Sequence, residues 1–207
     1  SLIKFKLIFK RMKYSSFVLL SFLSVILCDI QGFTVQSLKD SYRDAIPFIK
    51  AFYKKTFNLA RTTQLSGITL TNHMLTENNI EFKIDTGIVH FKFQKIALTV
   101  QGRGYLIKSA FKEFTNFSAK WNNVKYELSY SLNAKKIENG KYEVKYTKTG
   151  ESSLSFDIGR VSSKFNGLSN LETQLKNQVN SLNYTPYKDY LKKIAELVLD
   201  TLPNHFK

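Results

Sequence analysis

Residue types that carry catalysis are present in this sequence, but their spacing does not favour an active site. A nucleophile elbow needs a glycine on both sides of its serine, so that the turn from strand to helix can be sharp. The stretch Gly167-Leu-Ser169-Asn-Leu171 has only the first of these glycines. We interpret Ser169 as a helix cap, because Glu172 three residues later completes a capping-box pattern.

The three histidines, His73, His90 and His205, do not predict a metal site. Only His73 is followed closely by another ligand-type residue, Glu77, and that segment shows no helical pattern to place both on one face. We expect all three histidines at the surface and no bound metal.

Two further catalytic patterns are incomplete. Gly102-Arg-Gly104 lacks the third glycine of a dinucleotide-binding loop and precedes no helical pattern, so we interpret it as a bulge or bend in a curved sheet. No pair of carboxylates stands out as a glycosidase would need. The sequence therefore predicts a protein that is not an enzyme and requires no cofactor.

The chain is strongly basic, with 31 lysines and arginines against 16 aspartates and glutamates and a net charge of +15. The lysines are dispersed and form no single block, so a specific nucleic-acid site is not indicated. We interpret them as a solvated basic surface. Such a surface attracts anionic lipid headgroups, sulfated glycans or bacterial surface lipids through its long-range field.

The first regular element after residue 32 is an amphipathic helix that begins near Val35. Its apolar positions recur in steps of three and four as far as Tyr53, and basic residues occupy the other faces. A kink is expected at Pro47, because proline removes a backbone hydrogen bond. The pattern is typical of a helix that covers a core, and a helix lying on a membrane surface is the alternative.

Alternating apolar and polar residues in the middle of the chain predict an antiparallel meander. The alternating runs lie at 80–84, 89–93, 96–100, 124–132, 142–146 and 154–158. Asn139-Gly140 between two of them is a strong hairpin signal, because both residues tolerate positive φ. Asp85-Thr-Gly87 and Thr149-Gly150 are predicted to be two further turns.

Helical spacing returns in the last part of the chain. Apolar residues at steps of three and four run from Leu168 to Leu182, and a second segment begins at Thr185-Pro186 and ends at Pro203. No repeat, low-complexity segment or linker separates these elements. We therefore expect residues 33–207 to form one α+β domain.

Residues 12–32 have the layout of a secretory signal peptide. The basic pair Arg11 and Lys13 precedes an apolar run of about eleven residues, shorter than the roughly twenty that span a bilayer. Export with cleavage after Gly32 or Cys28 is expected, and an uncleaved membrane anchor is the alternative. Met12 is the expected start, so we interpret residues 1–11 as a non-native upstream extension.

The expected exported chain has no cysteine, because the one cysteine of the sequence, Cys28, lies in the leader. Residues 1–32 contain five lysines or arginines and one aspartate, so the net charge falls from +15 to +11 without them. With no disulfide, the domain must be stabilised by burial of apolar area.

Three short stretches carry a resemblance to a known family: Gly67-Ile-Thr-Leu70, the strand from Ile96 to Tyr105, and Lys164-Phe-Asn-Gly-Leu168. With the order helix, meander, helix, they make the chain from Val35 to Phe206 resemble the tubular lipid-binding superfamily in its short arthropod form. That form includes juvenile-hormone-binding and takeout-like proteins and the mite group 7 allergens. The sequence lacks the N-terminal cysteine pair usual in the first two groups, which the mite allergens also lack.

The resemblance implies a long curled antiparallel sheet, a C-terminal helix packed against it, and a tunnel between them for a fatty acid, terpenoid or related lipid. We therefore predict a secreted, extracellular carrier or scavenger of a hydrophobic small molecule, without stable membrane insertion. The expected cavity lining is the alternating apolar members of the strands and the centres of the C-terminal stripes: Phe82, Ile84, Phe91, Phe93, Leu98, Tyr126, Leu128, Tyr130, Leu175, Val179, Ile194 and Val198. An ordinary dry core has the same alternation.

The alternative function is a basic-surface recognition protein for anionic microbial lipids or polyanions, with no enclosed ligand; a hydrolase of unrecognised type is a third. On a eukaryotic secretory route, Asn116-Phe-Ser118 is an acceptor for glycosylation, expected in a polar stretch between two strands. Asn183-Tyr-Thr185 is followed by Pro186 and is not expected to be modified.

Overall fold

The computed structural model describes residues 33–52, 56–61, 64–72, 75–108, 111–155, 158–163 and 169–206. The predicted upstream extension and signal peptide, residues 1–32, lie outside these residues, as do His73 and the family-like stretch 164–168.

The elements follow one another in the predicted order of helix, sheet and helices. Along the chain they are α2 (Val35–Phe52), β1 (Thr56–Asn58), β2 (Leu65–Asn72), the 3₁₀ turn η1 (Glu77–Asn79), β3 (Ile80–Asp85), β4 (Ile88–Lys108), β5 (Phe111–Lys136), η2 (Glu138–Gly140), β6 (Tyr142–Ser155), β7 (Ile158–Ser163), α3 (Ser169–Asn180), α4 (Thr185–Thr201) and η3 (Leu202–His205).

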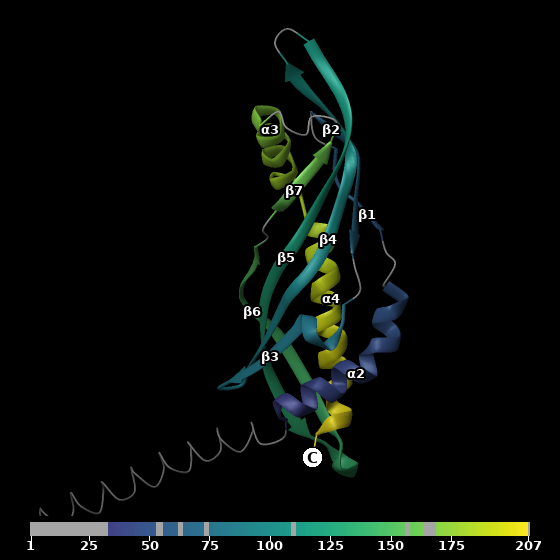
Figure 1. Cartoon of the computed structure of the whole chain (residues 1–207). Helices are drawn as coiled ribbons and strands as arrows, with labels where there is room; N and C mark the ends of the chain where they lie inside the picture. Colours follow the sequence, from purple (N-terminus) through teal and green to yellow (C-terminus); the bar gives the residue numbers. More distant parts are fainter. Residues whose placement is uncertain are drawn as a thin grey trace, which may run out of the picture.

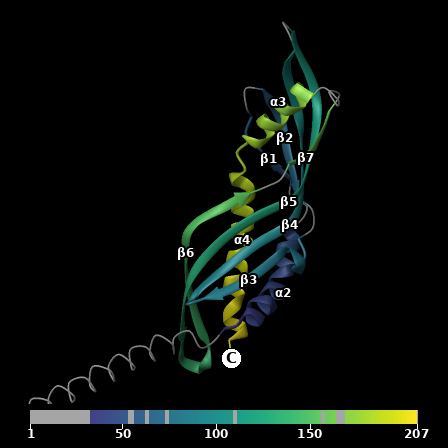
Figure 2. The ribbon, with the colours of Figure 1, turned by 60° about the vertical axis from the view of Figure 1, so that its left-hand side comes forward.

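The described strands form one antiparallel sheet. Its main order is β1-β2-β4-β5-β6, with β3 paired to β4 and β7 paired to β5. The sheet curls around α4, while α2 lies across the end of α4 that is nearer the C-terminus (Figures 1 and 2). The predicted α+β class, with a long curled antiparallel sheet and a C-terminal helix against it, is confirmed.

Period-two alternation decides which face of the sheet is buried. On β4, Val89, Phe91 and Phe93 are at most 1% exposed, whereas His90 and Lys92 between them are only partly buried, on the opposite face. The inner face contacts α4, which also packs against α2. The apolar residues of α2, the sheet, α3 and α4 thereby form one continuous core.

The apolar stripe of α2 faces this core. Leu38, Tyr42, Ala45 and Ile49, spaced at steps of three and four, are at most 3% exposed. The helix continues through Pro47. Among the described residues, no helix is both long enough and apolar enough to span a membrane.

Two of the three predicted turns join neighbouring strands. Thr86 and Gly87, with φ of 42° and 79°, connect β3 to β4, and Asn139 and Gly140, with φ of 74° and 73°, lie between β5 and β6. The prediction of a turn at Thr149-Gly150 was wrong. Gly150 has φ of 67° inside β6, where the register with β5 shifts, because a positive-φ glycine serves a bulge as well as a turn.

The sequence predicted several short strands where the structure has the long strands β4 and β5. β4 runs without a break through Gly102 and Gly104, and the irregularity lies on the partner strand β2, where Gly67 has φ of 57°. A Cβ atom on Gly104 would lie 2.8 Å from Leu65 Cδ2, so this glycine serves close packing. Asn116 was expected in a polar stretch between two strands, but it lies inside β5. The residue is exposed there.

Candidate ligand-binding groove

The structure places the predicted lining residues in the hydrophobic core. Eleven of the twelve are buried, and Ile84 is partly buried and packed against them. They are spread along the molecule: Leu175 and Val179 lie on α3, which contacts β4 and β7, while Ile194 and Val198 lie on α4.

Aromatic side chains cross the inner face of the sheet in a row. Phe82 of β3 packs edge-to-face on Phe91 of β4 with ring centroids 5.5 Å apart, Phe91 on Tyr130 of β5 at 5.9 Å, and Tyr130 on Tyr146 of β6 at 5.6 Å. These separations lie in the favourable range for edge-to-face pairs. We call these four residues the aromatic row.

The β6 end of the aromatic row is attached to α4 by hydrogen bonds. Tyr146 donates to Asp200 Oδ1 at 2.8 Å, and Tyr130 donates to Glu196 Oε1 at 3.4 Å. Burial raises the pKa of both phenols, and the neighbouring carboxylates raise it further, so both hydroxyls remain donors at neutral pH. This end of the row is therefore closed by paired polar groups.

The β3 end of the aromatic row opens on a groove of about 410 Å³ between α2 and β3. Val35, Tyr42, Ile80 and Phe82 supply its apolar surface, and Tyr42 and Phe82 are only 2% and 8% exposed. The remaining lining is polar: Gln36, Lys39, Arg43, Glu77, Asn78, Glu81 and Gln94. The volume lies within the range of small-molecule sites, and seven of the eleven lining residues are polar or charged.

Ion pairs fix one side of this groove. Arg43 Nε donates to Glu77 Oε1 at 2.8 Å and its Nη2 to Glu77 Oε2 at 3.4 Å, while Nη1 contacts Asp40 Oδ1 at 3.1 Å. The hydrogen bonds from Arg43 lower the pKa of the Glu77 carboxyl, which stays ionised at neutral pH. Arg43 therefore ties α2 to η1 and has its own charge compensated.

Hydrogen bonds from Asn79 fix the side of the groove that is formed by β4. Its Nδ2 donates to the carbonyl oxygens of Gln94 at 3.2 Å and Lys95 at 3.0 Å. Lys95 has φ of 56°, and the register between β4 and β5 shifts beside it. The Asn79 amide therefore stabilises an irregular point in β4 next to the groove.

Tyr42 lines the groove with a side chain that is mostly ring surface and 2% exposed. Its ring centroid lies 6.3 Å from that of Phe82, and its hydroxyl forms no hydrogen bond with any other residue that the structure describes. Burial raises the pKa of Tyr42 to about 12, and Glu77 and Tyr190 add smaller effects in the same direction. At neutral pH the hydroxyl is therefore a protonated donor.

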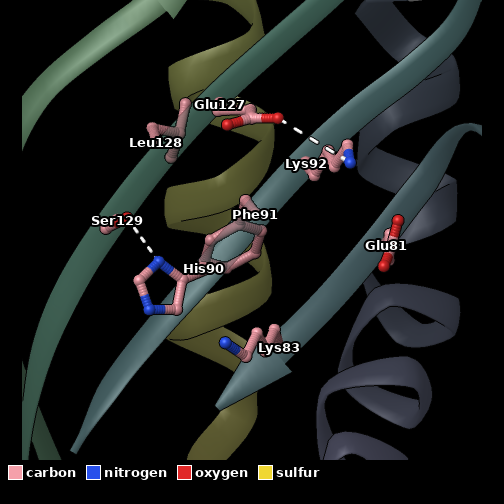
Figure 3. A pocket seen from close by; sticks show the side chains of 8 residues that line it. All are labelled: Glu81, Lys83, His90, Phe91, Lys92, Glu127, Leu128 and Ser129. Carbon is pink, nitrogen blue, oxygen red and sulfur yellow. Dashed lines mark hydrogen bonds and ion pairs between the residues drawn. The ribbon is translucent and has the colours of Figure 1, made fainter. Parts of the chain in front are cut away.

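A second pocket, of about 250 Å³, lies on the outer face of the sheet (Figure 3). Here His90 Nδ1 and Ser129 Oγ, on paired positions of β4 and β5, are 2.8 Å apart. Beside them Lys92 lies 3.9 Å from Glu127. Within the described residues no acid is hydrogen-bonded to His90, as a hydrolytic triad would require.

Sequence reasoning missed both the helical side of the groove and the His90–Ser129 pair. Tyr42 is one of the apolar positions of the helix predicted from Val35 to Tyr53, but nothing local to the sequence shows that it faces Phe82. His205, expected at the surface, is partly exposed, and its Nε2 lies 2.8 Å from Asp44 Oδ2. In the described part of the chain, no group of three or more histidine, cysteine or acidic residues is arranged to hold a metal ion.

No protein-family model matches the sequence, and no curated protein matches it. Among solved structures, Takeout 1 of Epiphyas postvittana is similar in fold, with a TM-score of 0.41 and 17% identity over 80% of this chain and 89% of that one. A lipopolysaccharide binding protein gives a TM-score of 0.40 and 15% identity over 83% of this chain. This chain spans only 39% of the length of that protein.

Takeout-like proteins are among those that the sequence resembles. Both TM-scores are below 0.5, so the function proposed below rests on the geometry of this chain.

Proposed function

We propose that this protein is a secreted carrier or scavenger of an apolar small molecule that binds in the groove between α2 and β3. The observation that carries the proposal is the amphipathic character of the groove. Its apolar surface includes the buried rings of Tyr42 and Phe82, which continue into the aromatic row, and its rim is charged and polar. An apolar chain bound there loses contact with water while its polar end stays hydrated.

A ligand longer than the groove extends inward only if α2 moves away from β3, because the core behind Phe82 is filled by the aromatic row. Few polar contacts oppose such a movement. Arg43–Glu77 on one side of α2 and Asp44–His205 on the other both involve exposed or partly exposed groups. Exposed ion pairs contribute little to stability.

Filling the groove with a large side chain tests this location. Asn78→Trp changes an exposed residue of the rim, so the fold should tolerate it. The variant should bind a fluorescent fatty-acid or terpenoid probe at least tenfold more weakly than the wild type. Asn133→Trp makes the same change at an exposed position of β5 and should bind like the wild type. Equal binding by both variants would move the site elsewhere, and no uptake of any apolar probe by the wild type would refute the carrier function.

Ionic strength separates this function from recognition of polyanions by the basic surface. Binding through dispersed lysines should weaken steeply between about 0.05 and 0.5 M salt, whereas an apolar ligand in the groove should stay bound. A steep salt dependence of the measured affinity would favour the surface-recognition alternative.

Secretion is part of the proposal and has its own test. The N-terminus of the secreted protein should lie between Asp29 and Gln36, and Asn116, which is exposed on β5, should carry a glycan if the cell is eukaryotic. A glycosidase should lower the mass of the wild type and leave Asn116→Gln unchanged. Recovery of residues 1–27 on the secreted protein would contradict export by this leader.

A further inference from the structure

Residues 135–141, which we call the β5–β6 turn, lie at the same end of the molecule as the start of α2 and the C-terminus (Figures 1 and 2). Ring contacts join these three segments. Tyr142, which follows the turn, stacks on Phe206 with ring centroids 4.6 Å apart, and Phe206 lies 5.7 Å from Phe33, just before α2. Val35, two residues further on, lines the groove. The β5–β6 turn is therefore connected by packing to the end of α2 at which the groove begins.

The β5–β6 turn exposes an apolar side chain. Ile137 is 44% exposed and Val35 is 37% exposed, so two of the three exposed large apolar side chains in the described part of the chain lie at this end. The Ile137 backbone N–H donates to the Lys141 carbonyl oxygen at 2.8 Å, and Asn139 and Gly140 between them have φ of 74° and 73°. The backbone of the turn is therefore closed on itself and holds Ile137 in contact with water.

Lysines surround this isoleucine in the sequence of the turn. Lys135, Lys136 and Lys141 are exposed, and none of them forms an ion pair with another described residue. Lys136 Nζ lies 6.0 Å from the centroid of the Tyr142 ring. Glu138 is the one carboxylate of the turn, so three positive charges stand against one negative charge. The turn therefore carries a net positive charge around an exposed apolar side chain.

An anionic bilayer surface fits both features of the turn. Its headgroups attract lysines, and the boundary between headgroups and acyl chains accepts an apolar side chain. A soluble polyanion satisfies the lysines alone and leaves Ile137 in water. We propose that the β5–β6 turn docks the protein on anionic phospholipid bilayers, with Ile137 entering the headgroup region and the lysines contacting phosphate groups.

Docking at this end brings the start of α2 to the membrane. Val35, which lines the groove and is itself exposed, then lies beside the bilayer. An apolar ligand can pass between groove and bilayer with less exposure to water, which is where its free energy is highest. This delivery step rests on the function proposed above, whereas docking of the turn does not.

Co-sedimentation with vesicles tests the docking. The vesicles are phosphatidylcholine alone or phosphatidylcholine with about 30% phosphatidylserine, at about 0.05 M and 0.5 M salt. Two variants change the turn: Ile137→Ser, and a triple variant that combines Lys135→Gln, Lys136→Gln and Lys141→Gln. All of these side chains are exposed, so the fold should tolerate the changes.

Each variant has a matched control at the other exposed sites that the chain offers. Phe48→Ser replaces a side chain that is 59% exposed and lies thirteen residues after Val35 on α2. A control triple variant removes three exposed lysines from β5 and α4: Lys120→Gln, Lys125→Gln and Lys193→Gln. Thermal melts check folding, and size-exclusion chromatography checks the oligomeric state.

The wild type should bind the anionic vesicles, release them at high salt and bind neutral vesicles poorly. Ile137→Ser and the turn triple variant should each bind at least tenfold more weakly, because one loses apolar contact and the other loses attraction to the headgroups. Both controls should bind like the wild type.

Four outcomes would overturn the docking: no binding of the wild type to anionic vesicles, equal weakening by a turn variant and its control, heparin-competed binding that Ile137→Ser leaves unchanged, or a wild-type dimer that Ile137→Ser dissociates. The third would make the turn a polyanion site, and the fourth a contact between two copies of the chain. None of them touches the carrier function. That function is measured by probe uptake without vesicles, which Ile137→Ser should leave unchanged, and absence of uptake by the wild type would count against the carrier function alone.

Discussion

The groove and the outer pocket both use strand β3, and Glu81 lines both, but they differ in the state of their polar groups. At the groove, Tyr42 is 2% exposed, and its hydroxyl has no protein acceptor among the described residues. In the outer pocket, His90 is paired with Ser129 and Lys92 with Glu127. A polar group that is already paired gains little from a ligand, because binding must first break the existing hydrogen bond.

The same alternation produces both sites. Phe82 points into the core beside α2, and Lys83, the next residue, is exposed on the outer face. Burial therefore separates an apolar site from a polar surface within one strand. Within the described residues, His90 and Ser129 have no hydrogen-bonded acid beside them, so their proximity alone does not complete a hydrolytic triad.

The largest expected effect is on stability, and it appears when neighbouring residues on opposite faces of β4 are each replaced by alanine. Phe91→Ala should lower the free energy of unfolding by about 3–5 kcal/mol, because Phe91 is 1% exposed and contacts both Phe82 and Tyr130. His90→Ala, one residue away, should cost less than about 1 kcal/mol. Urea denaturation of both variants measures the difference.

Similar costs for Phe91→Ala and His90→Ala would show that the outer face carries structural weight that its partial exposure does not suggest. A small cost for Phe91→Ala alone would mean that the core behind the groove is already loosely packed. Such looseness would favour a ligand that extends inward.

Much of this comparison was predictable from the sequence. Alternation in β4 correctly placed Phe91 and Phe93 inside, and Asp85-Thr-Gly87 and Asn139-Gly140 correctly located the turns, because both signals are local. The contact between Tyr42 and Phe82 joins residues forty positions apart in sequence, so no local pattern reports it. The core residues of α3 were grouped with those of α4 for the same reason: periodicity gives the buried face, not its partner.

Gly150 shows a second limit of local signals. Thr149-Gly150 was predicted to be a turn, whereas β6 continues through Gly150, which has positive φ, as a bulge opposite β5. Whether a glycine turns the chain back or only shifts the register depends on the pairing of the whole strand. That pairing is decided by burial along β5, far from Gly150 in sequence.

Alkaline pH should weaken the groove side of the molecule through Tyr42. Because its folded pKa is raised to about 12 from the model-peptide value of 10, its contribution to stability is complete below pH 10 and is lost as pH rises toward 12. Burial also raises the pKa values of Tyr130, Tyr146, Tyr184 and Tyr187, so their contributions to stability also fall as the pH rises above 10. Between pH 10 and 12, Tyr42→Phe should therefore lose less stability than the wild type.

The measurement is urea denaturation at a series of pH values, with phenolate absorbance followed in parallel. Tyr184→Phe should reduce the loss between pH 10 and 12 as well, because burial raises the pKa of Tyr184 in the folded state, whereas its phenol ionises near pH 10 in the unfolded state. Equal losses in Tyr42→Phe and the wild type would contradict the burial of a protonated Tyr42 hydroxyl.

The smallest expected effect concerns the outer pocket. Ser129→Ala removes the hydroxyl that lies 2.8 Å from His90 Nδ1, but both residues are partly exposed and water can replace the lost contact. Cross-strand pairs of this kind contribute about 0.2–1 kcal/mol, so the free energy of unfolding should fall by no more than that. The affinity for the apolar probe should not change, because Ser129 is on the opposite face of the sheet from the core and the groove is between α2 and β3.

If Ser129→Ala instead weakened probe binding several-fold at unchanged stability, the outer pocket would bind the ligand despite the pairing of His90 with Ser129. The outer face would then have to be treated as a second site, and the distinction between paired and unpaired polar groups would fail as a guide to function in this fold.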